Sequence, residues 1–419
     1  MKKEFYIKTR QNYLNLLDDN SIAVLFSGKL IQRSGDQDFQ FEANKNFYYL
    51  TGINQEEVIL VIVKSGKTVK ESLFIEKYDE VMSKWVGDKL TPEEATEISG
   101  IENIHFLEDF EKELFNTLNN NRKSYFDINK IYLDLERRND DYYDSQALQF
   151  SSQIKIDYPH LIVKNAYNLI VSLRMIKTEE EIELIQESID VTKLALENLM
   201  RNIKPGLYEY QIETFFDSVI KFNGNKDKAF ETICAAGKNA TILHYIKNNN
   251  IAQANELIQF DLGCRTDYYV SDISRAYPIS KKFTVRQKEV YEAVLDVNKK
   301  CIAYLKPGLT WQDYNNYAIK LITEWLKKLN VITKDEDYIN YYWHSIGHSI
   351  GLDTHDPSLY NQQIKEGMVI TVEPGIYIEE ESIGIRIEDN VLITKTGTIN
   401  LSKDIIKEVK DIEQFMNTK

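Results

Sequence analysis

The chain has little cysteine and lacks any long apolar run. Its three cysteines, Cys234, Cys264 and Cys301, are widely spaced and form no Cys-x-x-Cys pair, which is typical of reduced thiols. No stretch approaches the roughly 18 apolar residues that a membrane helix needs, and the first ten residues contain no apolar core of a signal peptide. The sequence therefore predicts a cytoplasmic protein with no membrane segment.

The sequence also has fewer basic than acidic side chains. The 419 residues include 51 Lys and Arg against 65 Asp and Glu, which gives a formal net charge of −14. Such a protein is repelled by nucleic acid and by anionic membranes, so neither is expected as the main partner. Hydrophobic content of 43% and charged content of 28% are ordinary for a folded protein, and the length allows two domains with cores of their own.

We predict two domains of mixed α/β (α+β) class, spanning residues 1–170 and 171–419. The first alternates strand-like runs with polar helical windows, which indicates an α/β domain with a largely buried sheet. The second begins just before a helix start at Thr178, where Thr178-Glu-Glu-Glu181 forms a capping box. The strand-like runs of the first domain are residues 21–26, 58–63 and 72–75.

The second domain contains an internal repeat. A helix predicted from Thr178 leads to Lys204-Pro-Gly-Leu207, and another predicted from Thr284 leads to Lys306-Pro-Gly-Leu309. An amphipathic helix follows each of these turns, and an acidic hairpin follows each amphipathic helix. The matching order predicts two related halves that face each other across a shared site.

Carboxylates stand inside strand-like apolar segments of both halves, where an unpaired charge costs too much to bury. Only Arg275 and Arg386 lie close to them in sequence, which is too few cations to neutralise the set. Two divalent metal ions, with His348 as a further ligand, would satisfy all of them. The carboxylates are Asp261, Asp272, Glu373 and Glu388.

Spacing predicts that Asp261 and Asp272 share one hairpin. If its turn is centred between Thr266 and Asp267, the two side chains lie directly opposite each other on one face, about 5 Å apart. Two such hairpins that converge would suit two metal ions about 3.5–4 Å apart that share bridging carboxylates.

Glu373 and Glu388 repeat this arrangement around the acidic tip at residues 379–382. The alternation of apolar and polar residues after the tip places Arg386 on the same face as Glu388. Arg386 is therefore predicted to support the ligands from the side.

Histidine is scarce, yet three of the six histidines, His344, His348 and His355, fall within twelve residues. The His-x-x-x-His spacing lacks the glutamate of a His-Glu-x-x-His zinc motif, and Gly347 and Gly351 weaken a helix there. One imidazole among the carboxylates makes an oxygen-rich site, which favours Mn²⁺, with Co²⁺ or Zn²⁺ as alternatives.

Taken together, these segments resemble the pita-bread metallopeptidases and, within them, the Xaa-Pro aminopeptidases (aminopeptidase P). The resemblance runs from about residue 4 to the end. In the first domain it rests on Arg33-Ser-Gly-Asp36, Asn44-x-x-Phe-Tyr-Tyr-Leu-Thr-Gly52 and Lys84-Trp85-x-Gly87. In the second it rests on Asp261-Leu-Gly, Ser271-Asp272-Ile-Ser-Arg-Ala-Tyr-Pro278, His344-x-x-x-His348-x-x-Gly-Leu-Asp-x-His355, Thr371-Val-Glu373-Pro-Gly-x-Tyr377 and Gly384-Ile-Arg386-Ile-Glu388-Asp.

The resemblance implies a creatinase/aminopeptidase-P-like α/β domain followed by a pita-bread domain with a pseudo-twofold repeat. It also implies a homo-oligomer, either a dimer or a tetramer, because Trp85 matches a tryptophan that completes a neighbouring subunit's pocket in tetrameric members. The implied metal ligands, with Asp272 and Glu388 bridging, are Asp261, Asp272, His348, Glu373 and Glu388. The implied substrate-binding residues are His244, His355, Arg386 and Trp85.

The implied activity is metal-dependent hydrolysis of the N-terminal Xaa-Pro bond in peptides with proline at the second position. A hydroxide that bridges the two metal ions would attack the scissile carbonyl. Glu373 would take the proton of the attacking water and pass it to the leaving nitrogen. His344 and His355 would steady the oxyanion and the backbone on the proline side.

Other activities stay open on the same residues. An Xaa-Pro dipeptidase (prolidase) uses the same chemistry in a site closed to longer peptides. A non-catalytic binding protein on this fold is a more distant alternative, although such proteins typically lose ligands. A methionine aminopeptidase fits the extra first domain poorly, and creatinase-like hydrolysis without metal does not explain a complete ligand set.

Metal content provides a first testable prediction. Four carboxylates and one imidazole offer enough ligands for two ions and too much negative charge for one. We expect active protein to hold about two Mn²⁺ per chain, to lose activity on chelation and to regain it with Mn²⁺. Elemental analysis beside a peptidase assay measures both, and full activity of metal-free protein would contradict the prediction.

Overall fold

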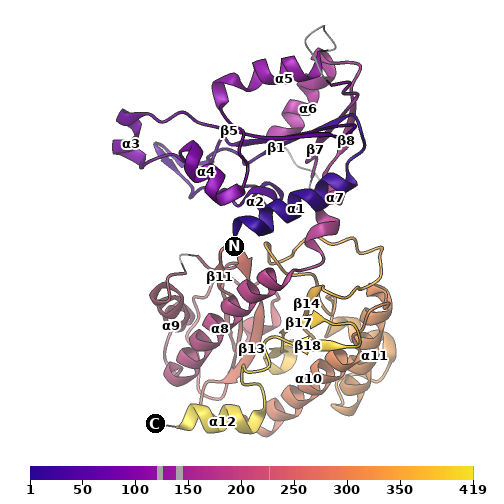
Figure 1. The fold of residues 1–419 in the computed structure, drawn as a ribbon. Coiled ribbons are helices and arrows are strands. Elements are labelled where there is room, and N and C mark those ends of the chain that lie inside the picture. Colours follow the sequence, from indigo (N-terminus) through magenta and orange to yellow (C-terminus); the bar gives the residue numbers. More distant parts are fainter. Residues whose placement is uncertain (120–125, 138–144, 226, 419) are drawn as a thin grey trace. The chain divides into compact units, whose positions relative to one another are not determined.

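The computed structural model describes residues 1–119, 126–137, 145–225 and 227–418. The chain divides into two compact units, Met1–Arg174 and Met175–Lys419 (Figure 1). The domain boundary predicted between residues 170 and 171 lies within the last helix of the first unit, α7 (Tyr167–Arg174). The predicted mixed α/β class is confirmed.

The N-terminal unit is built around a six-stranded sheet among its described residues, in the order β6-β5-β4-β1-β7-β8. The three strand-like runs predicted from sequence form β1, β4 and β5. Its strands are β1 (Ser21–Phe26), β2 (Gln32–Ser34), β3 (Gln37–Asp38), β4 (Ile59–Ser65), β5 (Thr68–Ile75), β6 (Ile104–Phe106), β7 (Lys130–Leu133) and β8 (Ile162–Asn165). Its other helices are α1 (Lys3–Leu16), α2 (Lys45–Thr51), α3 (Glu80–Val86), α4 (Pro92–Ser99), η1 (Leu107–Asp109), α5 (Phe110–Leu118) and α6 (Gln146–Asp157).

Helices cover both faces of this sheet, as its apolar strands require. All six residues of β1 are buried. Ile22, Val24 and Phe26 pack on one face with Phe110 and Leu114 of α5. Figure 1 shows α5 and α6 on that face and α1, α2 and α7 on the other. The unit therefore has a core of its own.

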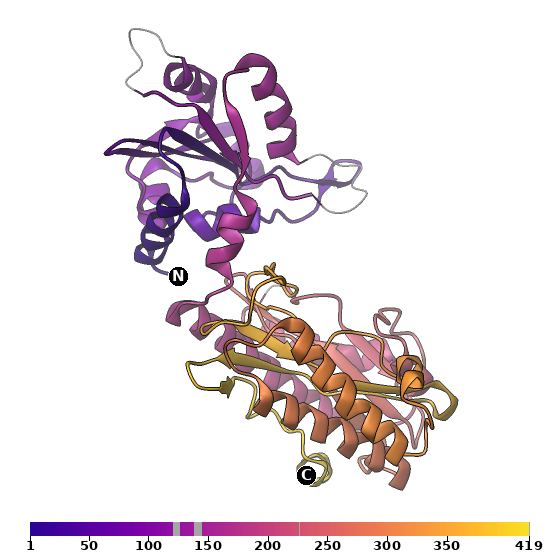
Figure 2. The ribbon, with the colours of Figure 1, turned by 90° about the vertical axis from the view of Figure 1, so that its right-hand side faces the viewer.

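The C-terminal unit repeats one order of elements, as the sequence predicted. Each half begins with two packed helices and continues into antiparallel strands; Figure 2 shows the second helix pair, in orange, lying side by side. The first half contains α8 (Glu179–Asn202), α9 (Glu209–Phe222), β9 (Ile233–Ala236), η2 (Gly237–Thr241), β10 (Leu257–Leu262), β11 (Arg265–Thr266), β12 (Tyr269–Val270) and β13 (Ile273–Pro278). The second contains α10 (Val285–Tyr304), α11 (Trp311–Lys328), η3 (Asp335–Asn340), β14 (Val369–Val372), β15 (Gly375–Ile378), η4 (Glu379–Glu381), β16 (Ile383–Arg386), β17 (Asp389–Ile393), β18 (Thr398–Asn400) and α12 (Val409–Asn417).

The helices begin where the capping residues predicted. Thr178 caps α8 and Thr284 caps α10, each in a complete capping box with the side chain three residues later. These reciprocal bonds satisfy backbone N–H groups that have no partner inside the helix.

The register predicted for the first hairpin is wrong by two residues. Asp261 lies opposite Ser274, not opposite Asp272. The reason is the turn, which is centred on Asp267 and Tyr268, both with positive φ (44° and 73°). A two-residue turn with both φ positive is the type that matches strand twist, and it moves the centre of the hairpin by one residue. Asp272 therefore lies diagonally across from Asp261.

The register predicted for the second hairpin is confirmed. Val372 pairs with Asp389 on one side and Gly375 pairs with Arg386 on the other. The same register continued through the gap between them sets Glu373 opposite Glu388. The two carboxylates therefore start from facing positions.

Two glycines permit the close approaches on which the ligand positions depend. A Cβ on Gly263 would lie 1.8 Å from the Ser271 carbonyl oxygen, and one on Gly347 would lie 2.1 Å from the Thr371 carbonyl oxygen. Because both obstacles are backbone atoms, no side-chain rotation could relieve the clash. Any larger residue would push the adjacent Asp272 or His348 out of place.

The three cysteines are buried and form no disulfide. Burial raises the pKa of Cys264 to about 11 and that of Cys301 to about 12, so these thiols stay protonated near neutral pH. Among the helices of the described ranges, none combines the length and apolar character needed to cross a membrane.

Candidate metal centre

Ligand candidates from both halves meet in the C-terminal unit. Asp272, His348 and Glu388 each offer one donor atom, and these atoms all lie within 4.8 Å of one another. Asp272 stands between β12 and β13, Glu388 between β16 and β17, and His348 in the loop before β14. Residues separated by more than a hundred positions thus form one cluster.

Glu373 joins this cluster through His348. The Nε2 atom of His348 lies 3.4 Å from Oε1 of Glu373 and 3.5 Å from Oδ2 of Asp272. The other ring nitrogen, Nδ1, donates to the Ser349 carbonyl oxygen at 3.0 Å, which leaves Nε2 with a lone pair toward the acids. Thr371 accepts from the His348 N–H at 2.9 Å and donates to Glu373 at 3.1 Å, so one hydroxyl holds both residues.

Asp261 reaches the cluster through Ser274. The Ser274 hydroxyl lies 2.9 Å from Oδ1 of Asp261 and 2.9 Å from Oε2 of Glu388. Arg386 pairs with the other oxygen of Asp261 at 2.7 Å and donates from Nε to the Ser274 hydroxyl at 2.7 Å. All the carboxylates predicted as ligands are therefore linked in one site, with a single guanidinium among them.

The electrostatics of this set are unfavourable without a cation. Burial, and then the neighbouring carboxylates, raise the pKa of Asp272 well above its ordinary value. Burial and the charge of Asp272 raise the pKa of Glu388 in the same way. Although burial opposes the charge of Arg386, Asp261 and its other neighbours raise the pKa of that guanidinium, so it stays charged. One cation cannot compensate this group of acids.

The donor set fits divalent metal ions. Oδ1 of Asp272 and Oε1 of Glu388 are buried and have no hydrogen-bond partner among the described residues. Buried oxygens of this kind are rare unless a bound ion or water satisfies them. Carboxylate oxygens with one imidazole nitrogen are ligands that Mn²⁺, Co²⁺ and Zn²⁺ accept.

The other two clustered histidines lie beside the ligands and are not among the three closest donors. The ring of His355 stands 4.2 Å from the ring of His348, edge to face. Burial and then the nearby His348 lower the pKa of His355, and His244 is also close enough to His355 to lower it. Across residues 341–356 the chain forms no helix, so the two-histidine helical zinc motif is excluded.

His344 is held by a chain of hydrogen bonds. Its Nδ1 donates to the Ser345 carbonyl oxygen at 2.8 Å, so the neutral ring accepts through Nε2 from the Tyr377 hydroxyl at 2.9 Å. Tyr377 in turn accepts from Arg386 at 3.1 Å. His344 Nδ1 also lies 3.9 Å from Oε2 of Glu373, the predicted proton carrier.

Sequence reasoning missed the roles of Tyr377, Ser274 and Thr371. Tyr377 is buried, and its motif position gave no sign of a hydrogen bond to His344. Of the two roles predicted for Arg386, support of the ligands agrees with the structure, because its guanidinium is buried and bonded to Ser274, Tyr377 and Asp261. The second predicted role, contact of Arg386 with substrate, stays a prediction.

Trp85 lies in the N-terminal unit, on the short helix α3. Its side chain is 82% exposed. A large exposed aromatic side chain is typical of a contact surface, and the predicted part of Trp85 in a neighbouring pocket stays a prediction.

Comparison with known proteins covers both units. Residues 183–395 match metallopeptidase family M24, and residues 6–126 match the N-terminal domain of aminopeptidase P. The Xaa-Pro aminopeptidase of Haemophilus influenzae is 31% identical, with 100% of this chain and 98% of that protein aligned.

Solved structures agree along the whole length. A structure from Bacillus anthracis described as an aminopeptidase P is 45% identical, has a TM-score of 0.97 and covers 99% of this chain and 98% of that one. Aminopeptidase P from Escherichia coli with the inhibitor Pro-Leu is 26% identical, has a TM-score of 0.90 and covers 99% and 98%. Divalent metal ions follow from the metallopeptidase family and from the donor set described above.

Asp272→Asn tests whether this carboxylate holds metal. The substitution keeps the size of the side chain and removes the charge, so we expect loss of at least one metal ion and a fall in turnover of about a thousandfold or more. Because Asp272 suffers like-charge repulsion, the metal-free variant should melt at the same temperature as the metal-free parent or higher. Elemental analysis and thermal melting measure both; two bound metals with a near-normal rate would reduce Asp272 to a strand residue.

Proposed function

Since the chain belongs to metallopeptidase family M24 and, within it, to the Xaa-Pro aminopeptidases, we propose that it hydrolyses the peptide bond between an N-terminal residue and a following proline. The observation that carries this proposal is the cluster of Asp272, His348 and Glu388 with its buried, unpartnered oxygens. That cluster occurs in a chain aligned over its full length with Xaa-Pro aminopeptidases.

Two Mn²⁺ ions are the proposed cofactor, since most donors are carboxylate oxygens. When bound, the ions supply an attacking water of lowered pKa and a Lewis acid for the scissile carbonyl. Ser274, Thr371 and Arg386 support the ligands through the hydrogen bonds described above. The residues proposed to hold the ions are Asp261, Asp272, His348, Glu373 and Glu388.

Glu373 is the proposed proton carrier. Its Oε1 is oriented by Thr371 and its Oε2 lies toward His344, so both oxygens are near groups of the site. It would take a proton from the attacking water and deliver it to the proline nitrogen. An amide nitrogen is a poor leaving group until it is protonated, so the bond to proline breaks only with this proton.

His344 and His355 are proposed to act on the substrate. A donor to the oxyanion is needed as the carbonyl becomes tetrahedral. In its neutral form His344 donates through Nδ1 to the Ser345 carbonyl oxygen and accepts at Nε2 from Tyr377, so Nε2 can donate to the substrate only when it also carries a proton. His355 is exposed and lies against His348, which supports contact with the peptide on the proline side. His244, also exposed, is proposed to contact the substrate.

We also propose a homo-oligomer, either dimeric or tetrameric, in which exposed Trp85 contributes to a neighbouring subunit's pocket.

A cytoplasmic location is proposed as well, and three buried thiols without a disulfide are consistent with it. The complex of the Escherichia coli protein with the inhibitor Pro-Leu, a dipeptide that begins with proline, supports recognition of proline.

A comparison of peptides tests the function. We expect Mn²⁺-dependent cleavage of Xaa-Pro tripeptides, observed as release of the first residue by mass spectrometry, and no cleavage of matched tripeptides without proline. Cleavage restricted to Xaa-Pro dipeptides would identify a prolidase. Metal binding without cleavage of any of these peptides would favour a binding protein.

Alanine substitutions of the three clustered histidines separate catalysis from metal binding. His344→Ala and His355→Ala should each lose about 10²–10³-fold in rate, the usual value of an oxyanion donor, while both metals stay bound. His348→Ala should lose metal affinity together with activity. Elemental analysis beside kinetics measures this; metal loss in His344→Ala or His355→Ala with retention in His348→Ala would reverse the assignment.

A further inference from the structure

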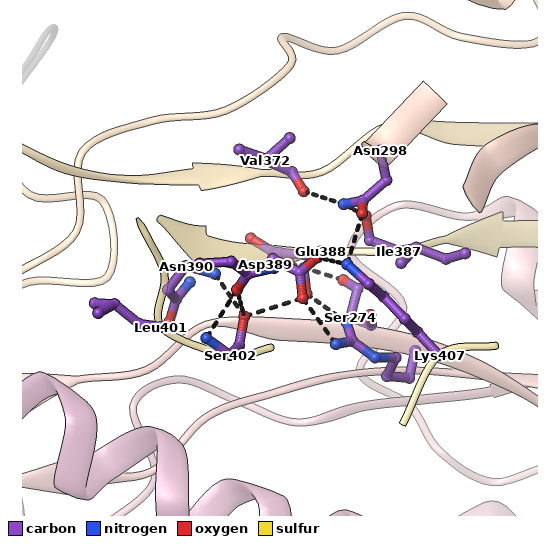
Figure 3. Close-up of polar contacts among 12 residues, drawn as sticks. Ser274, Asn298, Val372, Ile387, Glu388, Asp389, Asn390, Leu401, Ser402 and Lys407 are labelled. Carbon is purple, nitrogen blue, oxygen red and sulfur yellow. Dashed lines mark hydrogen bonds and ion pairs between the residues drawn. The ribbon is translucent and has the colours of Figure 1, made fainter. Parts of the chain in front are cut away.

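A buried charged cluster lies directly behind the metal ligands. We call it the Asp389 cluster; its members are Arg275 and five residues labelled in Figure 3, namely Asn298, Asp389, Asn390, Ser402 and Lys407. All of these side chains are buried except that of Lys407, which is 13% exposed. Buried charges are costly, so a set of this kind in the core needs an explanation beyond packing.

Asp389 is the centre of the cluster and is held by two cations. It pairs with Arg275 at 2.8 Å and with Lys407, and it accepts from the Ser402 hydroxyl at 3.0 Å. Two basic side chains therefore contact one buried carboxylate, which is adjacent in sequence to Glu388.

Members of the cluster bond the backbone at the ligands. Arg275 Nη1 donates to the carbonyl oxygens of Ser274 and Glu388. Asn390 makes two bonds to the backbone of Asp272, accepting from its N–H at 3.1 Å and donating to its carbonyl oxygen at 2.7 Å. The two residues proposed as bridging ligands are therefore fixed at the main chain by this cluster.

Asn298 makes similar hydrogen bonds to the backbone of the second hairpin. Its Nδ2 donates to the carbonyl oxygens of Val372 at 3.1 Å and Ile387 at 3.2 Å. These are the residues immediately before Glu373 and Glu388. One amide group of α10 thus spans the two strands that present those ligands.

Lys407 connects these contacts. Its Nζ donates to Oδ1 of Asn298 at 2.9 Å and pairs with Asp389, so it orients the Asn298 amide and balances the carboxylate (Figure 3). Lys407 comes from the segment between β18 and α12, and its own carbonyl oxygen accepts from the Tyr291 hydroxyl at 2.9 Å. The end of the chain is thereby tied to the backbone that carries the ligands.

We propose that Lys407 is a positioning residue for the metal centre, acting through Asn298 and Asp389 on the strands that present Glu373 and Glu388. If Lys407 loses its ammonium group, Oδ1 of Asn298 loses this donor, and Asp389 keeps Arg275 as its cation. The Asn298 amide could then rotate and release the carbonyls of Val372 and Ile387. The inference rests on the proposed function for its kinetic consequence, whereas metal binding tests it separately.

The test compares substitutions at Lys407 with a matched lysine. Lys407→Met removes the charge and the donor, Lys407→Gln keeps a donor, and Lys407→Arg keeps the charge. Lys299→Met is the control, because Lys299 pairs at 2.6 Å with Glu408, next to Lys407, in an ion pair whose side chains are 49% and 48% exposed. Metal affinity is measured by calorimetric titration of Mn²⁺ into metal-free protein, at a temperature below its melting transition. A separate peptidase assay measures kcat and KM for an Xaa-Pro tripeptide.

We expect Lys407→Met to melt cooperatively and to bind at least one Mn²⁺ about 10- to 100-fold more weakly, with a similar fall in kcat and little change in KM. Lys407→Arg should recover most of the loss, and Lys299→Met should match the parent. If Lys407→Met does not fold, Lys407→Gln takes its place in the same measurements.

Unchanged Mn²⁺ affinity in folded Lys407→Met or Lys407→Gln would overturn the inference, even if the melting temperature fell, because the lysine would then only stabilise the core. An equal loss of affinity in Lys299→Met would also overturn it. The parent protein could also bind Mn²⁺ and cleave no Xaa-Pro peptide, which would contradict the proposed function. If the loss of Mn²⁺ affinity were still confined to the Lys407 variants, this inference would stand.

Discussion

Repulsion among buried carboxylates is the constraint on which the C-terminal unit depends. Asp261, Asp272, Glu373 and Glu388 gather in one site, where Arg386 pairs with Asp261; burial, and then the charges of the neighbouring carboxylates, raise the pKa values of Asp272 and Glu388 well above their ordinary range. A protein can keep such a group only if cations bind or if the acids take up protons. Metal binding and the stability of this unit are therefore linked, and the same charges that oppose folding of the metal-free protein supply affinity for metal.

The fold satisfies this constraint by fixing the main chain beside the ligands while leaving some ligand oxygens without hydrogen-bond partners among the described residues. Hydrogen bonds from Asn390, Arg275 and Asn298 go to backbone atoms at or beside the ligands, while Oδ1 of Asp272 and Oε1 of Glu388 have no partner among the described residues. Ligands held in this way keep their geometry without losing their coordination sites, which is the arrangement that precise metal binding requires. The repeated halves add symmetry, since each supplies an acidic hairpin to a shared centre.

Much of this could be predicted from residue types and spacing. Capping boxes at Thr178 and Thr284 determine where two helices start, because the cap bonds lie within four residues. Acids within apolar strands indicated metal, because burial of charge has few other solutions. The acidic tip at residues 379–382 marked the centre of the second hairpin and so gave the register that brings Glu373 opposite Glu388. Full-length similarity to Xaa-Pro aminopeptidases agrees with these local signals.

By itself, then, the sequence determined the elements, the ligand types and the family, all of which depend on local spacing and side-chain chemistry. Tertiary structure decided the rest. The first hairpin turns at Asp267 and Tyr268 without a glycine to mark the positive φ angles, so its register could not be read from the residues. The partners of Arg386 and Lys407 lie far away in sequence, at Asp261 and Asn298. Such contacts exist only once the strands are packed, because no local pattern specifies which distant groups will share a buried position.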